Sequence, residues 1–431
     1  MSHDSTAVIR PAHAVQGLVR IPGDKSISHR YAMLASIARG TSRFHNFSAA
    51  CDCASTLGCV AALGAQWRRA DDGAVEISGI GPALKAPAAP LDCGNSGSTM
   101  RMLSGILAGQ FFASELFGDE SLSRRPMARI IKPLADMGAT IASSDAGRPP
   151  LMIRGGALRA IHYKPEVASA QVKSCILFAG LFAQGETIVE EPIRTRDHGE
   201  LALQAFGAEV ERRGTTTGIR GGQPLSAIEA HVPRDLSSAA FFLCAAALFP
   251  GSHISLPGIL MNPTRARLLD ILVSMGLKIS VAQIEQHHGE LAGAIEARGA
   301  TWKGGTIVGA DSAALIDEIP ALAAIAPYSE EGLEVRDAKE LRVKESDRIT
   351  AVAINLRKMG AEVEERPDGF RIPGHQRLHG AELDSFGDHR IAMAFAVAAL
   401  RAEGETLIRH ADVAGVSYPT FFEDLRAIAA S

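Results

Sequence analysis

Two series of short segments recur along this chain with a period of about 70 residues. In the first series, a glycine ends each predicted helix. These glycines lie 74, 69, 69 and 84 residues apart: Gly64, Gly138, Gly207, Gly276 and Gly360. Glycine suits the end of a helix because it adopts the left-handed conformation without a steric clash. Such regularity predicts internal repeats, which constrain the fold more than any other feature of the sequence.

The second series consists of polar turns that open apolar helices. Its members lie 70, 74, 66, 82 and 71 residues apart: Lys25, Asn95, Ser169, Asp235, Asp317 and Asp388. Two series with the same period predict six units. An open solenoid is the alternative, but solenoid repeats are typically shorter, at ~20–50 residues. Six larger units favour two globular halves of three units each.

Each unit follows a common order of predicted elements. The polar turn opens a helix, a glycine starts a short β-branched strand, and a second amphipathic helix ends at the glycine of the first series. Two short strands usually complete the unit. The first helices are predicted at Ser28–Ala38, Met102–Leu107, Val172–Phe182, Ser238–Phe249 and Ile391–Leu400. This βαβαββ-like order predicts an α/β or α+β fold.

The phase of the repeats predicts two domains. Units one to three begin at Gly23, and units four to six begin near Pro233. A polar, Gly- and Thr-rich stretch, Arg212–Pro224, lies at the midpoint. We therefore expect an upper domain of residues 21–234 and a lower domain of residues 1–20 with 235–431.

Composition excludes several classes of protein. The net charge of −4 and an aromatic content of 5% argue against a nucleic-acid partner. The longest apolar run, Ala239–Phe249, is too short to span a bilayer, and the N-terminal residues do not resemble a signal peptide. The six cysteines form no C-x-x-C pair. Free thiols in a reducing cytoplasm are therefore expected rather than a zinc site formed by Cys51, Cys53 and His45.

Several predicted helix openings collect cations. Lys25 and Arg30 lie in one such turn, and others hold Arg125, Arg196 and Arg390. A helix N-terminus already carries a partial positive charge, so cations there are unfavourable unless an anion binds. Salt-bridged surface helices are the alternative, since Asp or Glu lies beside several of these residues. The recurrence favours a small ligand with several negative charges.

Two carboxylates differ from the others in their surroundings. Asp317 lies among apolar residues in Ala313–Pro320, which makes it a candidate general base. Helix capping by Asp317 is the alternative. Glu345 lies beside Lys344 and is a candidate proton donor, although a first-turn glutamate favoured by the helix dipole would look the same.

The motifs together resemble the enolpyruvyl transferase family, and within it a divergent bacterial class of the 5-enolpyruvylshikimate-3-phosphate (EPSP) synthases. The resemblance spans residues 22 to 397, in the order PGDKSISHR, GNSGSTMR, SRRPM, ASAQVKS, TRDH, LIDEIP, LRVKESDR and GDHRIAMA. It implies two domains of three βαβαββ units each, known as an inside-out barrel.

The resemblance also implies a reaction. The enolpyruvyl group of phosphoenolpyruvate would move to the 5-hydroxyl of shikimate-3-phosphate, with release of phosphate, as a step of aromatic amino-acid biosynthesis. The expected partners are these two small molecules, with no metal, organic cofactor, nucleic acid or membrane. A cytoplasmic monomer is expected, and glyphosate, which mimics phosphoenolpyruvate in this family, is an expected inhibitor.

The implied site residues fall into three overlapping sets. The catalytic residues would be Asp317, Glu345 and Lys25. Shikimate-3-phosphate would contact Lys25, Ser26, Arg30, Ser169, Ala170, Gln171, Arg196, Asp317 and Lys344. Phosphoenolpyruvate would contact Lys25, Gly97, Arg125, Gln171, Arg348 and Arg390.

The chain departs from the family pattern at two positions. Val416 and Glu340 stand where many members carry Lys and Asn.

The sister enzyme that acts on UDP-N-acetylglucosamine carries a cysteine in the loop matching Gly118–Met127, which here has none. A non-catalytic anion-binding protein is disfavoured because Asp317, Lys344 and Glu345 are all present. RNA-end processing on a related repeat fold is disfavoured by the acidic charge.

Overall fold

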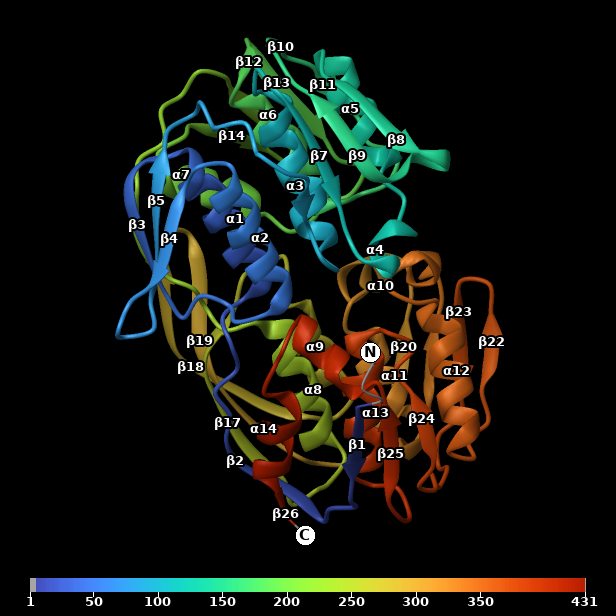
Figure 1. Cartoon of the computed structure of the whole chain (residues 1–431). Helices are drawn as coiled ribbons and strands as arrows, with labels where there is room; N and C mark the ends of the chain where they lie inside the picture. Colours follow the sequence, from blue (N-terminus) through green and yellow to red (C-terminus); the bar gives the residue numbers. More distant parts are fainter. Residues whose placement is uncertain (1–4, 431) are drawn as a thin grey trace. The chain divides into compact units, whose positions relative to one another are not determined.

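The chain folds into two compact units in the computed structural model (Figure 1). Unit 1 comprises Met1–Pro22, Pro233–Glu285 and Leu291–Ser431, and unit 2 comprises Gly23–Val232 and Gln286–Glu290. The structure describes residues 5–430, so residues 1–4 and 431 of the predicted lower domain lie outside the described residues. The short segment Gln286–Glu290, which the predicted boundaries keep in the lower domain, belongs to unit 2.

Three four-stranded sheets in the described part of unit 2 share one arrangement. In each, a parallel pair of strands is extended by two antiparallel strands. The first has the order β16 (Glu229–His231), β3 (Arg39–His45), β5 (Val75–Ile80), β4 (Gln66–Arg69). The second is β6 (Leu91–Asp92), β7 (Ala113–Phe117), β9 (Arg148–Arg154), β8 (Thr140–Ser144). The third is β11 (His162–Tyr163), β13 (Glu186–Glu190), β15 (Thr216–Arg220), β14 (Val210–Arg213), beside a small pair of β10 (Leu158–Arg159) and β12 (Ala183–Gln184).

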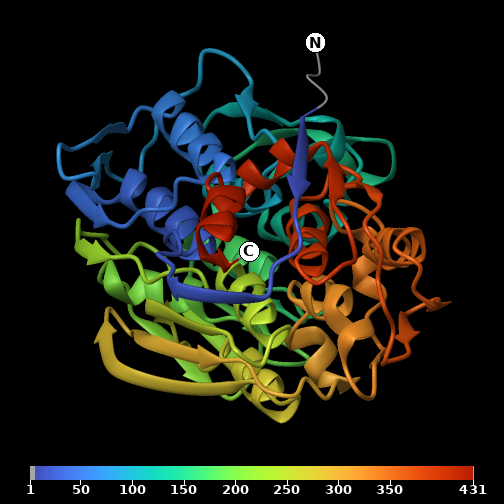
Figure 2. The ribbon, with the colours of Figure 1, turned by 90° about the horizontal axis from the view of Figure 1, so that it is seen from below.

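The sheets of unit 1 follow a similar arrangement. One has the order β18 (Lys278–His287), β19 (Glu290–Arg298), β17 (His253–Leu260), β2 (Ala14–Leu18), β26 (Ala429–Ala430). Another is β20 (Gly305–Ile307), β21 (Leu333–Val335), β23 (Gly369–Ile372), β22 (Glu364–Arg366). The last is β1 (Thr6–Ile9), β25 (Thr406–Arg409), β24 (Glu382–Asp384). Strand β1 lies antiparallel to β25, so the start of the chain completes a sheet formed by its end (Figure 2).

The helices fall between these strands in chain order. Those of unit 2 are α1 (Lys25–Ile37), α2 (Cys51–Ala62), α3 (Gly97–Ala108), α4 (Glu120–Ser123), α5 (Ala128–Met137), α6 (Ala170–Gly180) and α7 (His198–Ala205). Those of unit 1 are α8 (Leu236–Ala247), α9 (Arg267–Ser274), α10 (Ala310–Ala314), α11 (Ile319–Ile325), α12 (Arg348–Lys358), α13 (His389–Ala399) and α14 (Phe421–Ile428). Short 3-10 helices lie at Asp145–Gly147, Ala326–Tyr328, Lys339–Val343 and Ala411–Val416. No helix among the described residues is long and apolar enough to cross a membrane.

The helices that follow the polar turns form the centre of each unit. Every residue of α8 is buried, in keeping with its sequence LSSAAFFLCAAA, which is apolar on all sides. Helix α3 packs against α6 in unit 2, and α11 packs against α13 in unit 1. Burial on all sides leaves only the ends of these helices available for polar chemistry.

The predicted glycine positions are confirmed. All five glycines of the first series have positive φ, between +91° and +113°. Gly138, for example, ends α5 in the left-handed conformation. Helix α9 begins only at Arg267, because Asn262 and Thr264 form a separate turn before it.

Five of the six polar turns of the second series supply a helix cap, either from the series member itself or from the residue beside it. The side chains of Asp24, Ser96, Ser169, Asp235 and Asp388 accept hydrogen bonds from backbone N–H groups of the helices that follow. Such caps satisfy donors that the helix itself leaves without partners. Asp317 is different, because Glu318 occupies the N-cap position of α11. The capping alternative for Asp317 is therefore wrong.

Close packing of α3 on α6 predicts a sharp contrast between two glycine substitutions. A Cβ atom at Gly105 would lie 2.1 Å from the carbonyl oxygen of Cys175 on α6. Gly105→Ala should therefore lower the free energy of unfolding by about 1–3 kcal/mol. Gly58→Ala, on the exposed side of α2 with no atom within 4 Å, should instead raise it by about 0.5–1 kcal/mol. Urea unfolding of both variants tests this, and equal effects would contradict the packing.

Candidate functional site

The start of α1 holds the first predicted residues. Lys25 Nζ donates to Asp52 Oδ2 on α2 at 2.7 Å. The carbonyl oxygen of Ser26 accepts a 2.8 Å hydrogen bond from Arg30 Nη1, one turn later. Lys25 and Ser26 are half-buried, whereas Arg30 is buried. These side chains therefore form one polar surface at the helix opening.

Arg30 links α1 to α6. Its Nη2 and Nε atoms donate to Ser174 Oγ at 3.0 and 3.2 Å, and Nη2 also donates to the carbonyl oxygen of Ala170 at 3.5 Å. Burial lowers the pKa of the Arg30 guanidinium to about 10, against a smaller opposing effect of Glu200. Arg30 therefore still carries its charge at neutral pH. Arg196, half-buried, is close enough to act on Arg30 by like-charge repulsion.

Gln171 lies between two residues of α3. Its Oε1 accepts a 2.8 Å hydrogen bond from Arg101, and its Nε2 donates to Ser98 Oγ at 2.8 Å. Ser169, two residues earlier, caps α6 by accepting from the N–H of Val172 at 3.4 Å. The starts of α3 and α6 are thus tied together by side chains.

The loop before α5 brings a further cation to α3. Arg125 is buried and its Nη2 donates to Asn95 Oδ1 at 2.7 Å and to Ser121 Oγ at 3.1 Å. Gly97, the first residue of α3, lies beside it: a Cβ atom at Gly97 would be 3.4 Å from Arg125 Nη1 and 3.0 Å from Arg101 Nη1. The Gly97 backbone therefore faces two guanidinium groups.

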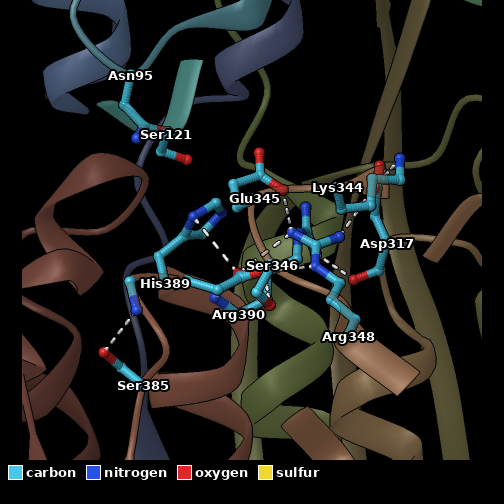
Figure 3. A network of polar contacts seen from close by, with 12 residues as sticks. Asn95, Ser121, Asp317, Lys344, Glu345, Ser346, Arg348, Ser385, His389 and Arg390 are labelled. Atoms are coloured by element: carbon cyan, nitrogen blue, oxygen red, sulfur yellow. Dashed lines mark hydrogen bonds and ion pairs between the residues drawn. The ribbon is translucent and has the colours of Figure 1, made fainter. Parts of the chain in front are cut away.

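Three cations of unit 1 lie close to Asp317. Lys344 Nζ donates to Asp317 Oδ1 at 3.2 Å, and Arg348 Nη1 lies 3.6 Å from the same oxygen (Figure 3). Arg390 Nη1 donates to the Asp317 carbonyl oxygen at 2.5 Å and lies 3.9 Å from the neighbouring carboxylate of Glu318. Asp317 is therefore surrounded by the cations that the resemblance assigns to ligand binding.

Arg348 is the most enclosed member of this group. Its Nε donates to Asp388 Oδ2 at 2.8 Å and its Nη2 donates to Glu345 Oε2 at 2.7 Å. Burial alone would lower the pKa of Arg348, but Asp388, Glu345 and Asp317 together raise it above its ordinary value. Among the described residues, Arg348 Nη1 is buried and has no hydrogen-bond partner. That nitrogen lies near the carboxylate of Asp317, 3.6 Å from its Oδ1, as an ion pair rather than a hydrogen bond.

Glu345 precedes α12 rather than lying in its first turn. The helix begins at Arg348, and Asp347 caps it. The alternative in which Glu345 is a first-turn glutamate is therefore wrong. Its carboxylate instead lies against Arg348, within the cluster around Asp317.

Three further arginines near helix openings form salt bridges with acidic neighbours. Arg124, beside Arg125, is exposed and pairs with Glu120 one turn earlier. Arg194 pairs with Asp197, and Arg342 pairs with Asp347. For these three residues the salt-bridge alternative holds.

Sequence reasoning missed four partners of the site residues. Asp52, Ser174, Arg101 and Glu318 contact Lys25, Arg30, Gln171 and Arg390, respectively. Ser174, Arg101 and Glu318 lie inside motifs that the sequence analysis singled out, so their positions were a usable signal. Asp52 lies outside every motif, 27 residues from its partner.

The cysteines do not form a metal centre with other ligands. All six are free thiols, and no group of three or more His, Cys, Asp or Glu residues within 5–430 could hold a metal ion. Cys51 is exposed, whereas Cys53 is buried, and burial raises the pKa of the Cys53 thiol well above its usual range. The arrangement therefore favours inert structural thiols.

Comparisons with known proteins agree over the whole chain. Residues 9–425 match the family model described as EPSP synthase (3-phosphoshikimate 1-carboxyvinyltransferase). The 3-phosphoshikimate 1-carboxyvinyltransferase of Koribacter versatilis is 61% identical over 420 residues, covering 97% of this chain and 98% of that protein. That of Solibacter usitatus is 54% identical over 431 residues, covering 98% and 99%.

Comparison with solved structures points to the same family. The solved EPSP synthase of Acinetobacter baumannii superposes with a TM-score of 0.87 at 41% sequence identity, covering 99% of this chain and 98% of that one. Because the family model and these relatives cover nearly the full length, the chain belongs to the EPSP synthase family. The resemblance drawn from the motifs is thus confirmed.

Burial of His29 beside the site predicts a pH effect on stability. Burial, together with the cations Lys25 and Arg30, lowers the pKa of His29 well below its usual range. Below about pH 6.5 the unfolded chain binds a proton that the folded protein does not, so stability is fully present above that pH and falls as the pH drops. His29→Gln should flatten this decline between about pH 6.5 and 5.

Urea unfolding at several pH values measures the decline. His13→Gln, at an exposed histidine, is the control and should retain the wild-type pH dependence. A His29→Gln variant with an unchanged slope would contradict the assignment of a buried, neutral imidazole.

Proposed function

We propose that this protein transfers the enolpyruvyl group of phosphoenolpyruvate to the 5-hydroxyl of shikimate-3-phosphate and releases phosphate. Family membership over nearly the full length supports this reaction. The cluster around Asp317 is the observation that carries it, because it combines a carboxylate with cations able to take an anion. The EPSP synthase match favours shikimate-3-phosphate over UDP-N-acetylglucosamine as the acceptor.

Residues of unit 2 provide most of the proposed contacts to shikimate-3-phosphate. Arg196 and the capped start of α6 bind its phosphate, because guanidinium groups and helix N-termini both suit phosphate oxygens. Ser26, Arg30, Ala170 and Gln171 contact the rest of the molecule. Lys25 contacts both substrates, and Asp317 and Lys344 face the 5-hydroxyl.

Phosphoenolpyruvate carries a phosphate and a carboxylate, which require several cations. Arg125, Arg348 and Arg390 supply them, with Gly97 and Gln171 beside the ligand. The buried N–H group at Arg348 Nη1 supports this role, since a ligand oxygen would supply the hydrogen bond that it lacks among the described residues. Gly97 supports it too, because a glycine lets an anion approach the start of α3 closely.

The proposed chemistry needs one base and one acid. Asp317 takes the proton from the 5-hydroxyl as its oxygen bonds to the central carbon of phosphoenolpyruvate, and Glu345 gives a proton to the methylene carbon. Glu345, left as a carboxylate, takes a proton back from the resulting methyl group, and phosphate leaves with the electron pair of its C–O bond, which restores the double bond. Cations around both carboxylates hold the anionic substrate in line with these groups.

We further propose that the chain consists of two domains of three βαβαββ repeats each. The recurring arrangement of a parallel strand pair extended by antiparallel strands supports the repeats. The division into two compact units supports the domains. The cytoplasmic location and the monomeric state stay predictions.

Phosphate release tests the reaction directly. Purified protein is mixed with phosphoenolpyruvate and either shikimate-3-phosphate or UDP-N-acetylglucosamine. Release with shikimate-3-phosphate alone is expected. Release with UDP-N-acetylglucosamine alone, or with neither acceptor, would overturn the proposal.

Replacement of Asp317 tests the proposed base. Asp317→Asn keeps the shape of the side chain but removes the proton acceptor, so turnover should fall by ~10²- to 10⁴-fold. Binding of shikimate-3-phosphate should change much less, because the residues of unit 2 remain.

A matched control comes from another aspartate of unit 1. Asp311 also accepts hydrogen bonds from an arginine, the exposed Arg267, but it is not part of the cluster around Asp317. Asp311→Asn should keep wild-type turnover. An Asp317→Asn enzyme with wild-type turnover would end the assignment of the base.

A further inference from the structure

A chain of buried hydrogen bonds runs from α1 through α2 to the start of α3. His29 Nδ1 lies 2.7 Å from Thr56 Oγ1, which lies 2.6 Å from Thr99 Oγ1. Thr99 Oγ1 in turn donates to Ser96 Oγ at 2.7 Å, and Ser96 caps α3 by accepting from the N–H of Thr99 at 3.0 Å. None of the four side chains is exposed to solvent.

Counting donors shows which group donates to which along this series of hydrogen bonds. A hydroxyl group has one proton to donate. Thr99 gives its proton to Ser96, so it must accept from Thr56, and Thr56 must then accept from His29. His29 therefore carries its proton on Nδ1. Its other ring nitrogen, Nε2, is buried with no hydrogen-bond partner among the described residues, as suits an unprotonated atom.

Neighbouring charges keep the imidazole neutral. Lys25 precedes His29 by one helical turn, and Arg30 follows it directly. Both cations oppose a further positive charge on the buried ring, which burial itself already disfavours. In the neutral ring one nitrogen carries the proton and the other does not, so a proton on Nδ1 leaves Nε2 without one.

We propose that His29, Thr56 and Thr99 are positioning residues that fix Ser96 and, through it, the turn at Gly97 where phosphoenolpyruvate binds. This inference rests on the proposed function. Valine side chains would fill the same space without buried polar groups that must find partners. The polar chain ends at the cap of α3, next to the residues that would face the anion. A helix start that binds an anion must be held to within a fraction of an ångström.

Two substitutions at Thr56 separate hydrogen bonding from packing. Thr56→Val keeps the shape but breaks the chain, whereas Thr56→Ser keeps the hydroxyl and loses a methyl group. For Thr56→Val we expect the KM for phosphoenolpyruvate to rise about three- to tenfold, with little change in kcat or in the KM for shikimate-3-phosphate. Thr56→Ser should instead keep the wild-type KM for phosphoenolpyruvate. A role in packing alone predicts that Thr56→Ser is the more damaging change.

Nuclear magnetic resonance gives a readout independent of activity. The ¹⁵N shifts of His29 should show a proton on Nδ1 in the wild type and in Thr56→Ser, and a rising share on Nε2 in Thr56→Val. Hydrogen exchange at the Thr99 amide, which donates to Ser96, should become faster only in Thr56→Val. Thr187→Val is the matched control, because the buried Thr187 hydroxyl has no hydrogen-bond partner among the described residues.

The outcomes distinguish this inference from the proposed function. A wild-type His29 with its proton on Nε2 overturns the direction of the chain. Unchanged Thr99 exchange and an unchanged KM for phosphoenolpyruvate in Thr56→Val overturn the positioning role. Failure of the wild-type protein to release phosphate with shikimate-3-phosphate overturns the proposed function alone, and Thr99 exchange then decides whether the chain fixes the start of α3.

Discussion

The charge of one buried guanidinium group organises the polar side of unit 1. Arg348 is only 1% exposed, and a cation so enclosed is costly unless carboxylates compensate it. Three carboxylates do so, from three separate segments: Asp388 at the start of α13, Glu345 before α12 and Asp317 before α11. Their common partner brings the starts of three helices together. Loss of any one carboxylate would leave part of a buried charge uncompensated.

In unit 2, the guanidinium groups of Arg30 and Arg101 donate to neutral partners. Arg30 donates to the hydroxyl of Ser174 and to two backbone carbonyls, and Arg101 donates to the amide of Gln171. Neutral acceptors fix the geometry of a cation without cancelling its charge. The hydrogen-bond partners of Arg30 and Arg101 therefore leave their charges uncancelled, which suits the phosphate binding proposed for this unit.

Local patterns in the sequence predicted what depends on local chemistry. The glycines of the first series follow from the steric demand of a left-handed residue, and Gly64, Gly138 and Gly360 all adopt that conformation. The burial of α8 follows from its uniformly apolar sequence. Pairings between distant segments leave no such pattern, because nothing local distinguishes Asp52 from other helix-start aspartates as the partner of Lys25. The same holds for Ser174, 144 residues from Arg30.

The contrast between capping and non-capping carboxylates explains why the assignment of a base falls on Asp317. Asp24 and Asp235 each accept a backbone N–H, so their carboxylates are committed to holding a helix in place. The carboxylate of Asp317 instead lies against the side-chain cations Lys344 and Arg348. A backbone N–H cannot turn to another partner without unwinding the helix, whereas a side-chain cation can. Under the proposed function, an arriving anion draws these cations toward itself, so we expect the surroundings of the Asp317 carboxylate to change when substrate binds.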